Sequence, residues 1–321
     1  MTSAGSSAVR SVRSAARVPR RLAGRVRGRW RDGLVAGRRQ PRWWPERLMS
    51  WPGMRGPHAD KEVVLFAAGR RYEFTPAVLR RFSGHVHHGT LRPTTQEVAD
   101  SLARLGLGTD AARTLATVSR FEGGYDAIQT YDSARFSWGF IQFSAPGGLF
   151  HVLAEIKATQ PELFASIFSP AGIDVEGWQV TVHRDGRTLV GPRAHDLLHD
   201  DPTLWTPFIA AAAIPAVQDA QVKVAHEHYF TRSMQATARA DGRDVAFGEL
   251  FAESEVGRTL LVDRAVRRGP ASAIALFGDA MRRCGVHADP VIDEVRRIEA
   301  HDTVRLTSIV ETISGTDAEG V

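Results

Sequence analysis

The sequence predicts an α+β protein that is mostly α-helical and carries small β-hairpins. Apolar residues recur at helical spacing over most of the chain beyond residue 60. Two pairs of short runs, rich in aromatic and β-branched residues, flank polar turns as the strands of a hairpin do. Hydrophobic residues make up 43% of the 321-residue chain and charged residues 24%, which is typical of a globular protein.

The first 58 residues differ in composition from the rest. Residues 1–50 contain 13 arginines, no lysine and two acids, a net charge of +11 in a chain whose total is +5. Like charges at this density repel, and little apolar surface offsets the chain entropy. We therefore predict a largely disordered Arg-rich arm over residues 1–58 and one domain over 59–321. The arm also contains four tryptophans that could dock on a surface, Trp30, Trp43, Trp44 and Trp51.

Local signals place the elements of the domain. Thr94 and Glu97 form a capping box that begins a helix, and Gly123-Gly124 end the helix that reaches Glu122. The predicted elements, in order, are an apolar run at 63–68, a helix-like segment at 75–84, helices at 94–106 and 109–122, hairpins at 128–143 and 178–190, and helices at 150–157, 203–240 (broken near residue 215), 248–268, 270–284 and 290–312.

Three carboxylates near the first hairpin could carry chemistry. Cleavage of a glycosidic bond needs a protonated carboxylic acid, and a second group that activates water, attacks, or stabilises positive charge. Glu122 ends a helix and faces an aromatic run, and both features favour its protonated form. Asp132 lies in the hairpin turn, where solvent would keep it ionised. Asp126 is a rival for the second carboxylate, although it could instead cap the turn before the first strand.

The stretch 119–144 resembles the lysozyme-like superfamily. In phage-type lysozymes a helix ends in a catalytic Glu-Gly, and a hairpin with an Asp and then a Thr follows. Here Glu122-Gly123 begins the pattern, Asp132 is ten residues on against the usual nine, and Ser137 stands in place of Thr. Residues 137–142, SWGFIQ, are similar to a signature of soluble lytic transglycosylases and goose-type lysozymes. Chitosanases of the superfamily pair a helix-end Glu with a hairpin Asp, and residues 261–269 are similar to a helix of peptidoglycan hydrolases.

The resemblance implies a lysozyme-like domain that works as a glycoside hydrolase without a cofactor. The expected substrate is peptidoglycan, cleaved by a muramidase-type hydrolase or a lytic transglycosylase, and the alternatives are chitosan and chitin. Glu122 would be the general acid, Asp132 the water-activating base or electrostatic partner, and Ser137 would position water. The residues expected to line the saccharide cleft are Tyr131, Trp138, Phe140 and Gln142. The competing hypothesis is a non-catalytic protein that binds glycan or serves a structural role, tethered through its basic arm.

The other motifs give weaker signals. His85, His87 and His88 could share a metal, but no acid or cysteine lies near them in sequence, so solvated loop residues are expected. In a helix, residues such as His226 and His228 point away from each other, so no metal site is predicted there. The single Cys284 excludes an internal disulfide and is expected in the core. Motifs of P-loop proteins and of serine hydrolases are absent.

Charge and hydropathy limit which partners and which location the sequence predicts. The arm would attract any polyanion, including nucleic acid or an envelope polymer, and could attach to a secretion or phage apparatus. No nucleic-acid-binding module is recognisable, so sequence-specific binding is not expected. The sequence has neither an apolar run of about 18 residues nor the apolar core of a signal peptide. We therefore expect no transmembrane segment, synthesis in the cytoplasm, and action at the cell wall after lysis, injection or non-classical export.

Overall fold

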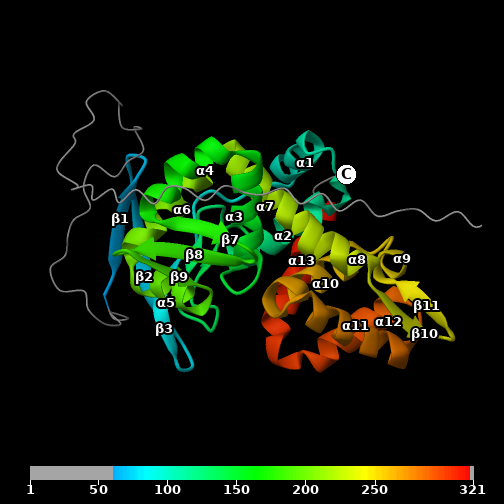
Figure 1. The fold of residues 1–321 in the computed structure, drawn as a ribbon. Coiled ribbons are helices and arrows are strands. Elements are labelled where there is room, and N and C mark those ends of the chain that lie inside the picture. Colours follow the sequence, from blue (N-terminus) through cyan, green and yellow to red (C-terminus); the bar gives the residue numbers. More distant parts are fainter. Residues whose placement is uncertain (1–60, 319–321) are drawn as a thin grey trace, which may run out of the picture. The chain divides into compact units, whose positions relative to one another are not determined.

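The computed structural model describes residues 61–318, with side chains to residue 315. It is an α+β fold, helical for the most part with small antiparallel sheets, which confirms the predicted class (Figure 1). The arm predicted over residues 1–58, with its tryptophans, lies outside the described residues. None of the helices described is long and apolar enough to cross a membrane.

One sheet joins the segments before and after the first two helices. Its six strands are antiparallel neighbours in chain order: β1 (Val63–Ala67), β2 (Arg70–Leu79), β3 (Phe82–His87), β4 (Ile128–Gln129), β5 (Ser137–Trp138) and β6 (Phe143–Ser144). The pairing of Val86 with Gln129 connects β3 to β4. Helices α1 (Thr95–Arg104) and α2 (Ala112–Glu122) are inserted between these two strands. The hairpin that follows Glu122 is therefore anchored on strands formed earlier in the chain.

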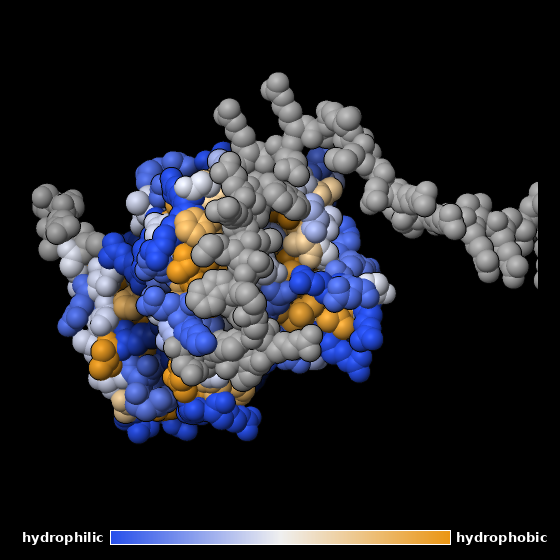
Figure 2. Space-filling model, turned by 90° about the vertical axis from the view of Figure 1, so that its left-hand side faces the viewer, coloured by the Kyte–Doolittle hydropathy of each residue, from blue (hydrophilic) through white to orange (hydrophobic). Residues whose placement is uncertain are grey.

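The prediction of a helix-like segment over 75–84 is wrong, because these residues form parts of β2 and β3. Side chains of β2 alternate, with Tyr72 and Phe74 buried and their neighbours exposed, which is the period of a strand. Gly84 also fits the sheet, since a Cβ there would lie 2.5 Å from Oγ1 of Thr130. Figure 2 looks onto this side of the molecule, where hydrophilic residues predominate and hydrophobic ones form separate groups.

Helices make up most of the remaining chain. They are α3 (Gly148–Thr159), α4 (Pro161–Ile167), α5 (Pro192–Asp200), α6 (Thr206–Ala212), α7 (Pro215–Ala225), α8 (Arg232–Gln235), α9 (Phe247–Leu250), α10 (Glu255–Arg268), α11 (Pro270–Cys284), α12 (Ala288–Ile298) and α13 (Thr303–Ala318). Single 3-10 turns cover Thr109–Ala111, Ser169–Ala171, Pro202–Trp205 and Ala300–Asp302, and a π-helical turn covers His226–Thr231. The capping box of α1 is confirmed, since the Thr94 hydroxyl accepts from the Glu97 N–H and the Glu97 carboxylate accepts from the Thr94 N–H.

Two small sheets complete the fold. The predicted second hairpin is confirmed by β8 (Gln179–Arg184) and β9 (Arg187–Val190), and β7 (Ile173–Glu176) adds a third strand. The end of the helix predicted over 203–240 is instead a strand, β10 (Thr237–Ala240), paired with β11 (Arg243–Ala246). Asp241 and Gly242 turn between them with φ values of 51° and 78°, the left-handed geometry of a two-residue hairpin loop. The helix predicted over 290–312 is divided into α12 and α13.

The hairpin after Glu122 is fixed by aromatic packing. Phe136 and Trp138 are fully buried, and their rings lie 4.9 and 5.1 Å from the ring of Phe208 in α6. Phe168, after α4, packs on the same Phe208 ring at 5.4 Å. Large aromatic side chains of this kind each contribute a few kcal/mol, about 1.5–3, when fully buried. The hairpin thus has a rigid base.

Candidate active site

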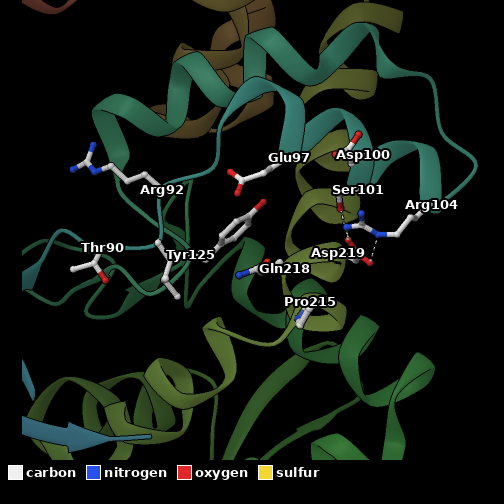
Figure 3. A pocket seen from close by; sticks show the side chains of 11 residues that line it. Thr90, Arg92, Glu97, Asp100, Ser101, Arg104, Tyr125, Pro215, Gln218 and Asp219 are labelled. Carbon is white, nitrogen blue, oxygen red and sulfur yellow. Dashed lines mark hydrogen bonds and ion pairs between the residues drawn. The ribbon is translucent and has the colours of Figure 1, made fainter. Parts of the chain in front are cut away.

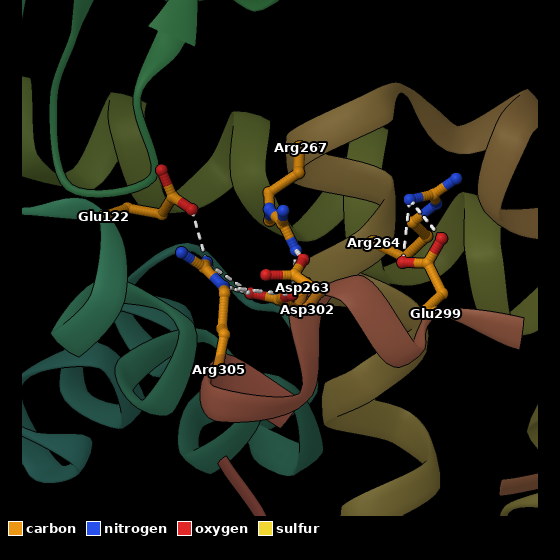
Figure 4. A network of polar contacts seen from close by, with 7 residues as sticks. All are labelled: Glu122, Asp263, Arg264, Arg267, Glu299, Asp302 and Arg305. Atoms are coloured by element: carbon orange, nitrogen blue, oxygen red, sulfur yellow. Dashed lines mark hydrogen bonds and ion pairs between the residues drawn. The ribbon is translucent and has the colours of Figure 1, made fainter. Parts of the chain in front are cut away.

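Glu122 lies at the last position of α2 because the next residue cannot continue the helix. Gly123 has a φ of 156°, and its N–H closes the last turn on the Ser119 carbonyl at 2.8 Å. A Cβ at Gly123 would approach the Cβ of Ala127 to 2.5 Å, so the Glu-Gly step is required by packing. The Glu122 side chain is 14% exposed and extends from the helix toward the loops of the sheet (Figure 4).

An arginine from the other end of the domain holds the Glu122 carboxylate. Nη2 of Arg305, in α13, donates to Oε1 of Glu122 and to Oδ1 of Asp263, each at 2.5 Å (Figure 4). Asp263 lies on α10 and is almost fully buried. The guanidinium of Arg305 also lies 5.3 Å from the centre of the Phe121 ring. Three helices therefore meet at one Glu–Arg–Asp chain, of which Asp263 is buried and Glu122 and Arg305 are partly exposed.

Further ion pairs lie on α10 beside Asp263. Arg267 approaches Asp263 to 3.8 Å and also pairs with Asp302, just before α13. One turn earlier on α10, Arg264 pairs with Glu299 at 2.7 Å (Figure 4). These contacts join α10 to the segment that precedes α13, and so they hold Arg305 in position beside Glu122.

The pKa of Glu122 is raised from its ordinary 4.5 to about 7. Burial is the main cause, since a charged carboxylate loses its hydration there. The positive charge of Arg305 acts in the opposite direction, and the negative charge of Asp263 adds to the increase. A carboxylic acid with a pKa near neutrality exchanges a proton readily at neutral pH, which is the property required of a general acid.

Asp132 lies in the turn between β4 and β5 and is partly exposed. Its carboxylate accepts from Nε2 of Gln129 at 2.7 Å and from the N–H of Ala134 at 2.8 Å. The neighbouring Tyr131 is close enough to both acids to respond to their charges. Burial first, and then the charges of Asp132 and Glu122, raise the pKa of the Tyr131 hydroxyl. The Tyr131 hydroxyl thus lies within the electrostatic influence of both acids.

The rival carboxylate, Asp126, is part of the framework. Its fully buried side chain accepts from the N–H groups of Thr90 and Leu91 at 2.9 Å and from the Thr90 hydroxyl at 3.0 Å, and His87 lies 3.6 Å away. Burial acts to raise the pKa of Asp126, but His87 and these hydrogen bonds outweigh it, and the pKa is lowered. Gly89 permits the arrangement, because a Cβ there would lie 2.6 Å from Oδ1 of Asp126. Asp126 therefore fastens the chain before α1 to the turn after α2.

Gln142 lies beside the Glu-Gly turn. Its amide Nε2 is 3.6 Å from the position of a Cβ on Gly123 and donates to the Gly139 carbonyl at 3.0 Å. Its Oε1 is buried and has no hydrogen-bond partner in the described part of the chain. The backbone of Gln142 is left-handed, with a φ of 55°. Strained backbone and an unused buried acceptor are features that gather at functional sites.

The other predicted site residues lie deeper. Ser137 is 3% exposed, and its strand position pairs with Gln129 and Ser144. Trp138 and Phe140 are fully buried, so in this structure they form the floor beneath the hairpin rather than accessible walls of a cleft. The difference arises because helices cover the sheet on the side where solvent was expected.

The histidine motifs are structural in this fold. His85 is buried in β3, with Nε2 2.8 Å from the Lys61 carbonyl, and His87 in the same strand contacts the Glu73 carbonyl at 3.0 Å. The expected solvated loop is therefore a strand at these two residues, whereas His88 is exposed in the loop after β3, as expected. His226 and His228 have different neighbours, stacking on Phe230 and His151 respectively. Cys284 is partly buried against the core.

Within residues 61–318, Asp174, Glu176 and His183 are placed so that they could bind one metal ion together. Their ligand atoms lie within 4.8 Å of one another, but two of the three residues are exposed. Asp174 is already paired with Lys157 at 2.6 Å. These features are those of a solvated strand surface.

Sequence reasoning had no means of finding Arg305. It lies 183 residues from Glu122, in a helix with no motif, and only the packing of α13 against α2 and α10 brings it to the acid. Asp263 lay in the segment similar to peptidoglycan hydrolases, but its contact with Arg305 had no local signal. The chain matches no protein-family model, no curated protein and no solved structure.

Proposed function

We propose that this protein is a lysozyme-like glycoside hydrolase that cleaves the glycan of peptidoglycan, with Glu122 as the general acid. The observation that carries the proposal is the buried Glu122 carboxyl, whose pKa is raised to about 7 while Arg305 holds one of its oxygens. A carboxyl in such a position can deliver a proton to a leaving glycosidic oxygen at neutral pH.

The residues around Glu122 support a division of roles. Asp132, partly exposed and held by two donors, would activate water or stabilise positive charge on the sugar. Tyr131 would contact the sugar between the two acids. Gln142 would accept from a sugar hydroxyl or from the attacking water after a side-chain rotation that brings its Oε1, buried in this structure, to the surface. Ser137 would act through the backbone of the hairpin, because its side chain is buried.

The test is the release of glycan fragments from purified peptidoglycan by wild type and by Glu122→Gln, with chitosan and chitin in parallel. We expect wild type to cleave and the variant to lose at least about a hundredfold, the lower range of general acid catalysis. Glu253→Gln, which changes an exposed glutamate on the same domain, is the matched control and should retain full activity. Full activity of Glu122→Gln would remove the acid from the mechanism. Binding of glycan without cleavage by wild type would favour the non-catalytic hypothesis.

A further inference from the structure

The turn between β2 and β3 extends beyond the body of the domain. Along β2, buried side chains alternate with exposed ones as far as Phe74, the pattern of a strand with one face on the core. Residues 78–81 are all exposed, so neither face of the hairpin is covered there. Figure 1 shows this turn as the free lower end of the cyan hairpin. Residues 78–82, the hairpin tip, are therefore open to a partner.

Apolar side chains are prominent at the hairpin tip. Val78 is 70% exposed and Leu79 is 47% exposed. The partly buried Phe82 lies opposite Leu79 in the strand pairing, and the Arg81 guanidinium is 5.1 Å from the centre of its ring. Isolated exposed apolar residues are ordinary on a protein surface, but a group of them more often marks a contact site. The tip would therefore gain free energy from entering an apolar environment.

The two residues of the turn itself, Arg80 and Arg81, carry positive charge that no ion pair within residues 61–318 neutralises. The sequence contains no acid over residues 74–96. Asp200, at the end of the helix that contacts β3, is already paired with Arg135. The hairpin tip therefore offers both guanidinium charges to a negatively charged partner.

The arginines that line the polar hollow beside α1 show the contrast (Figure 3). Arg104 is paired with Asp219 at 2.6 Å, and Arg92 donates to a backbone carbonyl at 3.0 Å. Both of these guanidinium groups thus have partners within the domain. Arg80 and Arg81 donate no such hydrogen bond in the described part of the chain, so their donors are available to a partner outside it.

The turn also departs from the composition that its geometry favours. The Arg80 backbone is left-handed, with a φ of 56°, a conformation that suits glycine or asparagine. Each of the other two-residue hairpin turns in the described part of the chain contains a glycine: Ala68-Gly69, Gly177-Trp178, Asp185-Gly186 and Asp241-Gly242. Between β2 and β3, arginine occupies both positions, at a local cost in free energy. Such costs are found where a residue serves a function.

The partner must offer negative charge next to an apolar phase. A nucleic acid or a charged envelope polymer supplies the charge but has no apolar phase for Val78 and Leu79. An uncharged membrane supplies the apolar phase but does not attract the two arginines. A membrane that contains anionic phospholipid supplies both, because its phosphates lie directly above its acyl chains. Charge complementarity and the exposed apolar side chains together favour this partner.

We propose that the hairpin tip inserts into the surface of a membrane that contains anionic phospholipid. Val78 and Leu79 enter the boundary between headgroups and acyl chains, while Arg80 and Arg81 pair with phosphate oxygens. The contact holds the domain at the membrane surface without spanning the bilayer. It goes beyond the proposed function and does not depend on Glu122.

The test must report on the tip itself, because residues 1–50, with a net charge of +11, would attract the same membrane. In the full-length chain with Cys284→Ala, the substitution Leu79→Cys allows one fluorophore to be attached at the tip. The vesicles contain about 30% phosphatidylserine in phosphatidylcholine, with nitroxide groups on some acyl chains as the quencher. We expect at least about threefold more quenching than in the matched control, Val190→Cys, whose valine is 42% exposed on β9.

Further substitutions separate the apolar and the charged contributions. The ratio of inserted to free tip, taken from the quenching at saturating lipid, should fall about fivefold with Val78→Ser. It should fall at least about tenfold when Arg80→Gln and Arg81→Gln are combined. The matched control combines Arg187→Gln and Arg193→Gln, which remove the same charge from exposed positions elsewhere and should change the ratio little. Vesicles of phosphatidylcholine alone should lower the ratio for the unsubstituted tip at least about tenfold.

Several outcomes would overturn the proposal. Absence of quenching at residue 79 would do so, whether or not the chain sediments with the vesicles, since sedimentation alone would place the contact elsewhere. Equal quenching at residues 79 and 190 would show that the tip has no special part in binding. Quenching that persists unchanged without both tip arginines, or equally on phosphatidylcholine alone, would remove the anionic lipid from the explanation. Glycan release is measured without vesicles, so this proposal and the proposed function can fail separately.

Discussion

Replacement of Glu122 by glutamine tests the electrostatics of the site through stability alone. In the unfolded chain this carboxyl has its ordinary pKa of 4.5, whereas in the fold the pKa is about 7. Between these values the folded state binds more protons than the unfolded state, so the free energy of unfolding falls as the pH rises. The stabilisation is fully present below about pH 4.5 and is lost as the pH passes through about 7. At about 1.4 kcal/mol for each tenfold change in proton affinity, the loss is about 3 kcal/mol.

Urea unfolding of wild type and Glu122→Gln over about pH 4.5 to pH 8 measures this loss. Because glutamine does not titrate, the free energy of unfolding of the variant minus that of wild type should increase by about 3 kcal/mol over the range. All other titrating groups are shared and largely cancel in the difference. Glu253→Gln, at an exposed position, should give a flat difference. A flat difference for Glu122→Gln would show that its pKa is ordinary and would refute the reasoning.

Three further predictions concern Glu122, Arg305 and Asp126. Since a general acid must be protonated, the rate of glycan release by wild type should fall above about pH 7, and a rate that is constant to about pH 9 would contradict this. Arg305→Met removes the cation that lowers the pKa of Glu122, so the falling limb of that profile should move at least about one pH unit higher; Arg305→Lys, which keeps the charge, should move it less. Asp126→Asn should reduce the free energy of unfolding by about 3 kcal/mol near pH 7, as measured by urea unfolding, because it replaces a buried charged acceptor. Since the pKa of Asp126 is lowered in the fold, the difference in unfolding free energy between wild type and Asp126→Asn should shrink as the pH falls below the ordinary pKa range of an aspartate. The rate of glycan release by Asp126→Asn should depend on pH as that of wild type does.

Features set by neighbouring residues could be predicted from the sequence. The capping box at Thr94, the termination of α2 at Gly123 and the hairpin after it are local, so pattern and propensity were sufficient. The Asp241-Gly242 turn was equally local, but the strand before it, β10, forms the end of a longer stretch of helical character, which obscured the hairpin. The prediction for residues 75–84 was wrong for the opposite reason. The conformation there is determined by the pairing of β2 with β3, which local sequence does not show.

The surroundings of the site required the tertiary fold. Trp138 and Phe140 were expected at a surface because aromatic residues near a candidate acid often contact sugars, but helices bury both. Arg305 reaches Glu122 only through the packing of α13. The sequence therefore indicated residue 122 as the candidate acid, but it did not indicate the groups that set the pKa of this residue.

The two buried carboxylates of this region show why burial alone does not identify an acid catalyst. Asp126 and Glu122 are both removed from water, yet the pKa of the first is lowered and that of the second is raised. Asp126 accepts hydrogen bonds at both oxygens from Thr90 and Leu91, which stabilise its anion and leave no oxygen open to a substrate. Glu122 has one strong donor, Arg305, and the charge of that donor is shared with Asp263. Its second oxygen can therefore carry a proton, and this difference in donors is the reason why we propose Glu122, and not Asp126, as the general acid.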